Sequence, residues 1–447
     1  MKLQDWNRFE KYVEELMLEE NIAGVAIAVA KDGKVIYENG FGYRNIEARE
    51  PVTKDTIFGI ASISKSFTAL AIMKLESEGK LSADDEVIKY LPDFKLSNLE
   101  DSSKVKIHHL LTHSVGLPPM KRCENFNDFV KHLAYLEKEP YYVLGEPGEY
   151  FSYCNDTFLL LGAIIEKVTG RLFRQYVTEH ILFPLEMHRS TFSLEEVYKF
   201  SNVTTPYIYQ KKTNQLMEVP WPQLGNYEVG GGIRSTVIDL IKYGQFYLNQ
   251  APELTKLAIK KDKIQKMFEP KYQIDRVSYY GFALKITPDY FGVTLIEHGG
   301  SQPGVSSNFG FVPEKNLVVA VLTNVTGVSV RNIWQAAINQ VLHIPFEQQP
   351  NREPVYEASM EELEQFVGTY AGAESNSQIK IYFENDSLKG NVFGEIYDLR
   401  ASDEQTLVVV KNDKPIKFYF DSNGKIWAAF FGVRMYPRVF EKTFVGL

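Results

Sequence analysis

Residues 60–68 read IASISKSFT and open a stretch whose apolar side chains recur at helical spacing until Gly79. Because residues three positions apart share a helix face, Lys65 is expected one turn beyond Ser62. A helix N-terminus also gathers unpaired N–H groups, which suits a serine whose reaction builds an oxyanion. Taken alone, the pattern is more typical of an N-capped helix with a solvated lysine, because about two Ser-x-x-Lys matches are expected by chance in a chain of 447 residues.

Length and composition limit the possible classes of protein. A chain of 447 residues exceeds what one hydrophobic core usually serves, so two domains are expected. The formal charge of −8, without a basic block, argues against a nucleic-acid or anionic-membrane partner. Cys123 and Cys154 are too few for a disulfide framework. The N-terminus opens into an amphipathic helix and no run of 18 apolar residues follows, so we expect a cytoplasmic protein.

The N-terminal three quarters of the chain predict an α+β domain over residues 1–345. An apolar strand at 24–30 and its hairpin partner at 34–38 precede the Ser62 helix. After residue 280 a period of two returns, before a helix over 330–342. Strands are predicted there at 281–286, 293–298, 307–312 and 317–322. Strands at both ends with helices between them favour one antiparallel sheet flanked by helices, with a helical region beside it.

The C-terminal quarter predicts a second, smaller domain. Prolines and polar residues at 346–358 are typical of a linker. A helix is expected to open at Ser359, with Glu362 completing a capping box. Short alternating strands joined by tight turns within 359–447 predict an antiparallel up-and-down barrel. Its strands are expected at 379–383, 388–392, 407–410, 416–420, 426–430 and 435–440. Such a barrel carries a ligand, limits access to a site or builds an assembly; the many aromatic strand residues favour the last two, and hence a homo-oligomer.

A Ser-Lys pair cuts an acyl bond only with further groups that move protons and bind the substrate. Tyr153, on a loop entering a helix, can relay protons to and from a leaving group. Asn155 can both orient Lys65 and bond a substrate carbonyl. These two residues are therefore candidates for the same site as Ser62.

His298 and the glycines after it end a predicted strand. Because glycines on an edge strand allow close backbone approach, a substrate could add there as an extra strand along Gly300. The N–H of Ser301 would then join the N–H of Ser62 in an oxyanion hole. This segment is the expected substrate-binding edge.

With these motifs in this order, the sequence resembles the serine β-lactamase and penicillin-binding-protein superfamily. The motifs are Ser62-x-x-Lys65, Tyr153-x-Asn155 and His298-x-Gly300. Flanking phrases are similar to the CubicO branch of serine peptidases and esterases; they lie at 55–62, 110–117, 147–155, 183–187, 231–236 and 322–324. The C-terminal part, opening at Phe366, is similar to the lipocalin-like domain appended to many CubicO peptidases. The whole arrangement resembles archaeal CubicO peptidases that act on peptides containing D-residues.

The resemblance implies a β-lactamase/DD-peptidase-like catalytic domain followed by a lipocalin-like barrel. It implies that Ser62 is acylated with Lys65 as its partner, and that Tyr153 acts as general base and then as general acid. Asn155 would bind the acyl side of the substrate, and His298 would complete the network. His298 departs from the best-known pattern, in which a lysine holds this place. Because an unperturbed histidine is mostly neutral above about pH 6.5, anchoring of a substrate carboxylate should be weaker.

The sequence therefore predicts a serine peptidase or amidase for short peptides, D-residue peptides among them, with an acyl-enzyme intermediate and without metal or cofactor. A carboxylesterase or weak β-lactamase using the same residues is the first alternative. A non-catalytic ligand-binding protein on the same fold is the second.

For three other features of the sequence, a structural role is favoured over a catalytic or ligand-binding one. His109 and His113 lie four apart on a predicted helix, but without the Glu of a zincin a capping or core-polar role is favoured over metal binding. The glycines at 230–232 lack a following Lys-Ser pair, which favours a pocket-lining turn over a phosphate site. Cys154 is expected to serve packing rather than nucleophilic attack.

Overall fold

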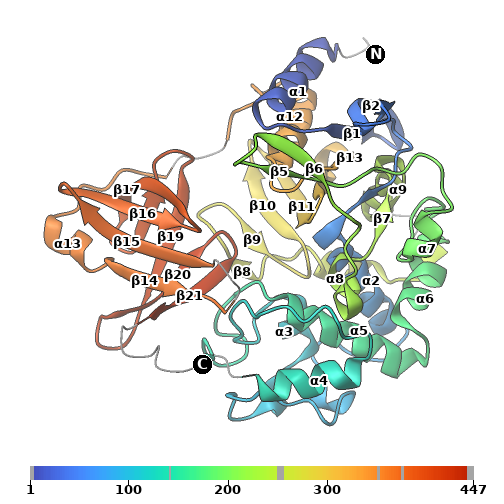
Figure 1. The fold of residues 1–447 in the computed structure, drawn as a ribbon. Coiled ribbons are helices and arrows are strands. Elements are labelled where there is room, and N and C mark those ends of the chain that lie inside the picture. The colour runs from blue at the N-terminus through green and yellow to red at the C-terminus, as the bar shows by residue number, and fades with distance from the viewer. Residues whose placement is uncertain (1–4, 140–141, 249–255, 350–352, 374–376, 440–447) are drawn as a thin grey trace. The chain divides into compact units, whose positions relative to one another are not determined.

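The computed structural model describes residues 5–139, 142–248, 256–349, 353–373 and 377–439. The chain divides into two compact units, each of which is assembled from separate segments (Figure 1). Unit 1 comprises Met1–Ala83, Leu161–Lys271 and Val277–Gln349, and unit 2 comprises Asp84–Leu160, Tyr272–Arg276 and Pro350–Leu447. One boundary, at Gln349, falls inside the expected linker, while the helical region from Asp84 groups with the barrel. Residues 350–352 of that linker and Phe440 of the last expected strand lie outside the described residues.

An antiparallel sheet forms the centre of unit 1, with its strands in the order β3-β2-β1-β13-β12-β11-β10-β9. The apolar stretch at 24–30 becomes β1, which lies between β2 and β13 and is buried along nearly its whole length because helices cover both faces of the sheet. The strands are β1 (Gly24–Lys31), β2 (Lys34–Asn45), β3 (Glu50–Pro51), β9 (Tyr279–Tyr280), β10 (Lys285–Tyr290), β11 (Val293–Gln302), β12 (Val305–Val312) and β13 (Leu317–Thr323). Two short antiparallel strand pairs lie outside this sheet: β4 (Phe58–Gly59) with β7 (Arg234–Ser235), which are far apart in the chain, and the hairpin of β5 (Tyr207–Gln210) with β6 (Gln215–Glu218).

Helices cover both faces of this sheet because successive strand residues point to opposite sides. One face, to which β1 contributes Ile27, packs on Phe9 and Trp334 from the first and last helices of the unit. On the opposite face a helix approaches so closely that a Cβ on its Gly244 would lie 2.3 Å from Val318. The helices are α1 (Asn7–Glu19), α2 (Ser64–Ser77), α6 (Phe173–Val177), α7 (Leu194–Val197), α8 (Glu228–Gly231), α9 (Val237–Leu248), α11 (Lys261–Lys266) and α12 (Val330–Leu342).

Most of the strands and helices expected in unit 1 are confirmed, and one strand is confirmed only in part. The segments 293–298, 307–312 and 317–322 lie in β11, β12 and β13, and the helix over 330–342 is α12. The strand expected over 281–286 is confirmed only at Lys285 and Ile286, which begin β10, whereas residues 281–284 form a turn between β9 and β10. The N–H of Gly281 donates to Leu284 O at 2.8 Å, and Ala283 adopts a φ of 56°, which an extended strand does not allow.

Unit 2 contains a closed antiparallel barrel of eight strands. The capping box that opens the preceding helix, α13 (Met360–Glu364), is confirmed: Glu362 N donates to Ser359 Oγ, and Ser359 N donates to Glu362 Oε2. The barrel interior is occupied by its own apolar side chains, among them Tyr370, Phe418 and Leu407. The strands are β14 (Gly368–Ala371), β15 (Gln378–Glu384), β16 (Ser387–Val392), β17 (Glu395–Asp403), β18 (Thr406–Val409), β19 (Lys414–Phe420), β20 (Ile426–Phe431) and β21 (Arg434–Val439).

The remainder of unit 2 is helical and packs with the barrel. Its helices are α3 (Ile107–Leu111), α4 (Phe129–Lys138) and the start of α5 (Asn155–Thr169), and the short strand β8 (Tyr272–Gln273) belongs to the same unit. Arg276 Nε forms an ion pair with Glu353 Oε2 at 2.6 Å.

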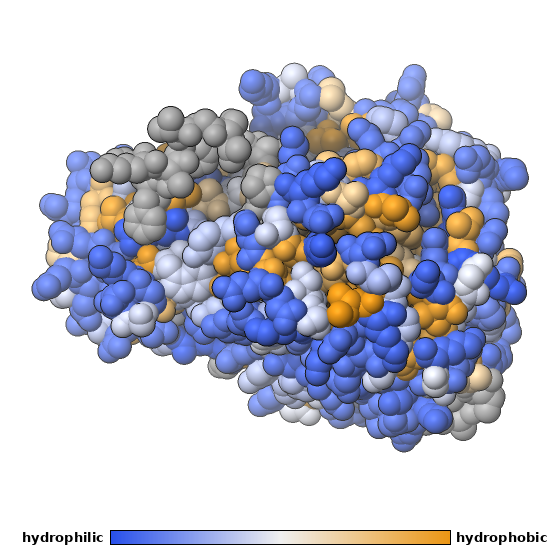
Figure 2. All heavy atoms as spheres, turned by 90° about the horizontal axis from the view of Figure 1, so that it is seen from below, coloured by the Kyte–Doolittle hydropathy of each residue, from blue (hydrophilic) through white to orange (hydrophobic). Residues whose placement is uncertain are grey.

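Hydrophilic side chains dominate the face of the molecule seen in Figure 2, and hydrophobic side chains occupy several separate areas of it. Within the described residues, no helix combines the length and apolar character needed to cross a membrane.

Candidate active site

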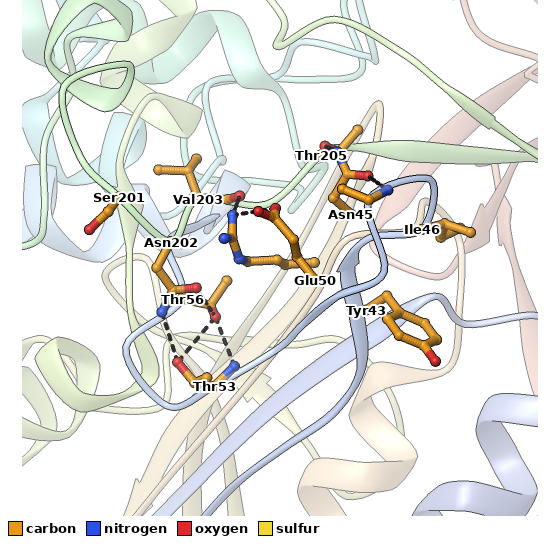
Figure 3. Close-up of polar contacts among 12 residues, drawn as sticks. Tyr43, Asn45, Ile46, Glu50, Thr53, Thr56, Ser201, Asn202, Val203 and Thr205 are labelled. Carbon is orange, nitrogen blue, oxygen red and sulfur yellow. Dashed lines mark hydrogen bonds and ion pairs between the residues drawn. The ribbon is translucent and has the colours of Figure 1, made fainter.

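The segment that leads to Ser62 is fixed by a polar network with residues 201–205 (Figure 3). Thr56 Oγ1 donates to Asn202 Oδ1 at 2.7 Å, and Asn202 Nδ2 donates to Thr53 Oγ1 at 2.8 Å. The N–H of Ile57 donates to the carbonyl of the same asparagine at 2.9 Å. Strand β4 follows at once and pairs with β7, so the chain reaches Ser62 from a position held on two sides.

Ser62 lies on a single 3-10 turn, η1 (Ala61–Ile63), and α2 begins two residues later. Ala61, directly before it, has a φ of 46° in the left-handed region, where a Cβ is unfavourable. The sequence predicted the helix but not this turn. Ser62 itself is only partly buried.

Lys65 contacts Ser62 as the three-residue spacing predicted: its Nζ donates to Ser62 Oγ at 3.1 Å. The same Nζ donates to Gly230 O at 3.0 Å, and the lysine side chain is 1% exposed. A buried amine requires such partners because desolvation is costly. A Cβ on Gly230 would lie 3.0 Å from Nζ, so glycine leaves the space that the lysine occupies. The segment predicted as a pocket-lining turn is thus the end of α8, whose backbone binds the lysine.

His298 lies on β11 and is held in one tautomer. Its Nδ1 is 2.5 Å from Gly299 O, and because a carbonyl can only accept, the proton is on Nδ1. Nε2 therefore accepts from the Tyr280 hydroxyl at 3.1 Å. Burial, with a further contribution from the positive charge of Lys65, lowers the pKa of His298 to about 4. The imidazole is neutral at neutral pH, and Tyr280 is a site residue that the sequence analysis missed.

The part of β11 after His298 runs against the segment before Ser62. Ser307 Oγ, on β12, donates to Ile60 O at 2.8 Å. A Cβ on Gly300 would lie 2.4 Å from that carbonyl oxygen, which explains the glycine. In the pairings of the described strands, β10 accompanies β11 only as far as Lys285 opposite Glu297. The following edge, with Ser301 exposed, is open to an added strand.

Tyr153 and Asn155 lie in unit 2. Tyr153 is buried directly before α5, which begins at Asn155, and its ring centroid is 4.1 Å from that of His113. His113 Nδ1 is 2.9 Å from Cys154 O, so this histidine has the core-polar role expected for it. Burial raises the pKa of the Cys154 thiol, which favours packing over nucleophilic attack.

The candidate residues are thus distributed over both units: Ser62, Lys65, His298, Gly300 and Ser301 in unit 1, and Tyr153 and Asn155 in unit 2. The structure brings Ser62 and Lys65 into contact, with His298 close enough for the lysine charge to affect it. The meeting of the two sets remains a prediction from the sequence. In the described part of the chain, no group of three or more His, Cys, Asp or Glu side chains is arranged to hold a metal ion.

Comparison with known proteins identifies relatives over nearly all of this chain. Residues 9–342 match the family described as Beta-lactamase. The chain is 27% identical to protein flp of Staphylococcus aureus strain MW2 over 345 residues, which cover 75% of this chain and 66% of that protein. The chain therefore spans a little under two thirds of the length of this curated relative.

Two solved structures extend the similarity through the barrel. The octameric penicillin-binding protein homologue from Pyrococcus abyssi is 32% identical, with a TM-score of 0.73, and the match covers 97% of this chain and 99% of that one. SurE is 19% identical, with a TM-score of 0.75, over 97% and 98% of the two chains, and shares the fold. The similarity to these two structures therefore extends beyond the residues that match the family.

Proposed function

This chain belongs to the beta-lactamase family, and from that premise we propose that it is a serine peptidase or amidase that cleaves short peptides through an acyl-enzyme on Ser62. The observation that carries the proposal is the 3.1 Å contact between Lys65 Nζ and Ser62 Oγ, made by a lysine that is buried and held by a backbone carbonyl. A solvated lysine on an N-capped helix, the alternative for this motif, would be exposed. The open edge of β11 beside Ile60 supports a peptide substrate, because an extended backbone can pair with it.

In the proposed reaction, Ser62 Oγ attacks the scissile carbonyl carbon while its proton passes to Lys65 and Tyr153, which act together as general base. The N–H groups of Ser62 and Ser301 stabilise the oxyanion, and Asn155 binds the acyl side. The C–N bond then breaks as Tyr153 returns the proton to the leaving amine. A water molecule attacks the ester carbonyl in the second half of the reaction and releases the acid and the free serine.

The charge state of His298 favours some substrates over others. Because its pKa is lowered to about 4, it supplies no positive charge for a substrate carboxylate at neutral pH. Its Nδ1 proton is engaged by Gly299 O, so it acts as an oriented neutral group beside Lys65. We therefore propose weak activity on β-lactams, and a carboxylesterase using the same residues is the runner-up, since uncharged esters need no such cation. Peptides with D-residues remain the candidate class suggested by the resemblance.

One panel tests this proposal against its alternatives. Wild type and Ser62→Ala are assayed on L- and D-aminoacyl anilides, short peptides of both chiralities, acyl esters and a chromogenic cephalosporin. Both proteins are also treated with a fluorophosphonate probe. We expect peptide or anilide turnover and labelling in wild type, and neither in Ser62→Ala. Labelling that persists in the variant would refute the nucleophile, turnover of esters alone would favour the esterase, and an unlabelled, inactive wild type would favour a ligand-binding protein.

We also propose that the protein is a homo-oligomer. The support is the homologue from Pyrococcus abyssi, which is octameric and aligns with 97% of this chain, so that the match extends into the barrel. A barrel whose interior is filled by its own side chains is better suited to assembly or access control than to carrying a ligand.

A further inference from the structure

The hairpin formed by β20 and β21 reaches from the barrel to the candidate catalytic tyrosine within unit 2. Phe431 pairs with Arg434, which leaves Gly432 and Val433 as a two-residue turn. Gly432 has a φ of 66°, as the first central position of a type II′ turn requires. A tight turn of this type matches the right-handed twist of the two strands that it joins.

The tip of this hairpin is bonded to the backbone of the tyrosine motif. The N–H of Tyr153 donates to Val433 O at 2.8 Å. On the far side of Arg434, the N–H of Met435 donates to Ser152 Oγ at 3.2 Å. Two hydrogen bonds from one strand end to consecutive residues restrict both the position and the rotation of the loop that presents the Tyr153 phenol.

Arg434, between those two anchors, presents its charge to the tyrosine ring. Its Cζ lies 5.9 Å from the centroid of the Tyr153 ring, within the range of a cation–π contact. The same ring is faced by His113, while Cys154 and Asp156 follow it in the chain. For the Cys154 thiol, burial has the largest effect and raises the pKa, whereas the charge of Arg434 acts in the lowering direction. The positive field of Arg434 therefore reaches this loop.

We infer that the β20–β21 hairpin holds Tyr153 in its reactive position and that Arg434 is a positioning residue which favours the deprotonated phenol. The inference rests on the proposed function, in which Tyr153 shares the work of general base. On this inference the barrel contributes to the reaction by holding the loop that carries Tyr153. A neutral residue at 434 should make the phenol harder to deprotonate, whereas a lysine should keep the charge.

The test compares pH profiles of kcat/KM for wild type, Arg434→Gln and Arg434→Lys on an uncharged acyl ester, so that no substrate carboxylate contributes. At an effective dielectric constant between those of protein and water, a charge about 6 Å away shifts a titration by about 0.5 to 1 pH unit. We expect the acid limb of the Arg434→Gln profile to move to higher pH by that amount, with kcat lowered more than KM is raised. Arg434→Lys should restore most of the wild-type profile.

Arg438 provides the matched control, because it lies on the same strand with its Cζ 5.8 Å from the ring of Tyr370 inside the barrel. Arg438→Gln can lower the melting temperature through the barrel, but its acid limb should coincide with that of wild type. Ser152→Ala removes one anchor and should lower kcat/KM about two- to tenfold without moving the limb.

A superimposable profile for Arg434→Gln, in a wild type that turns over and is labelled at Ser62, would overturn the inference alone. An equal shift of the acid limb in Arg438→Gln would also overturn the inference. The shift would then reflect a general change in the barrel rather than the charge beside Tyr153. A wild type that is neither labelled nor active would overturn the proposed function and, with it, this role of the hairpin.

Discussion

At the residue scale, the site depends on a buried amine and on the glycine that makes room for it. Lys65 Nζ is shared between Ser62 Oγ and Gly230 O, and the helix that carries it is tied to the same segment, because Thr68 Oγ1 donates to Val229 O at 2.6 Å. The amine is therefore fixed from two sides. Small displacements of Gly230 should move the lysine away from the serine.

Gly230→Ala is expected to lower kcat about 10-fold or more, because the new Cβ would lie 3.0 Å from Lys65 Nζ. Gly231→Ala is the matched control: a Cβ there meets only ordinary contacts, the nearest at 3.6 Å from Gln302. Steady-state kinetics and the melting temperature of both variants check the prediction. Equal losses of activity in the two variants would contradict it.

His298 makes the stability of the protein depend on pH. In the unfolded chain its imidazole takes up a proton below about pH 6.5, but in the folded protein only below about 4. A lowered histidine pKa therefore costs stability as the pH falls from 6.5 to 4, by about 3 kcal/mol in the limit. The loss on acidification should be smaller in His298→Gln.

Urea unfolding at pH 7 and pH 4.5 measures this difference. The free energy of unfolding of wild type should fall by about 2 kcal/mol more than that of His298→Gln between the two pH values. His188→Gln, at an exposed position, serves as the control and should follow wild type. If His298→Gln follows wild type as well, the imidazole is not protected from protonation in the folded state.

At the scale of the element, β11 carries the candidate binding edge and is anchored by an ion pair between the buried Glu297 and the partly exposed Arg331. Arg331 of α12 binds Glu297 with Nη2 at 2.7 Å and Nε at 3.0 Å, and Asn308 Nδ2 donates to the same carboxylate at 3.0 Å. Burial is the largest single effect and acts to raise the pKa of Glu297, but the positive charges of Arg331 and Lys285, together with the hydrogen bonds from Arg331 and Asn308, outweigh it and lower the pKa. The pair therefore stabilises the fold above the usual carboxylate range and loses this effect as the pH falls through the lowered value.

Arg331→Met should destabilise the protein by about 1 to 3 kcal/mol, because it leaves the Glu297 carboxylate buried without its cation, although Arg331 itself is partly exposed. The double variant Glu297→Gln with Arg331→Met should recover part of this loss, since no buried charge remains. Denaturant unfolding at pH 7 measures both. Additive losses in the double variant would show that the two side chains do not act as a pair.

At the scale of the whole molecule, the division into two units separates the candidate nucleophile from the candidate proton relay. Unit 1 contains Ser62 with its lysine, and unit 2 contains Tyr153 together with the barrel hairpin that binds it. The barrel is therefore linked to the tyrosine loop through the hydrogen bond from Tyr153 N–H to Val433 O and the one from Met435 N–H to Ser152 Oγ. The proposed homo-oligomer is a second feature at this scale.

The mass in solution is expected to be a multiple of the 51.2 kDa chain, by comparison with the octameric homologue. Size-exclusion chromatography with light scattering, over a range of protein concentrations, measures it. A variant truncated before Ser359 should lose mass beyond that of the removed residues if the barrel builds the assembly. A single species of about 51 kDa at all concentrations would contradict the proposal.

The sequence by itself determined the parts of this protein that follow from local pattern. The spacing of Ser62 and Lys65, the strands of β11 to β13 and the capping box at Ser359 depend on neighbours along the chain, and each was predicted. Two barrel strands, β14 and β17, were not predicted; β17 carries charged residues that hide its alternation.

Only the tertiary structure decided which distant groups meet. No sequence motif marks the carbonyl of Gly230, the hydroxyl of Tyr280 or the hairpin at Arg434. A backbone acceptor, a single phenol or a single guanidinium becomes significant only through its position in the fold. The pKa of His298 is of the same kind, since burial and a neighbouring amine set it. The chemistry of the nucleophile was thus encoded locally, whereas its tuning depends on contacts between segments far apart in the chain.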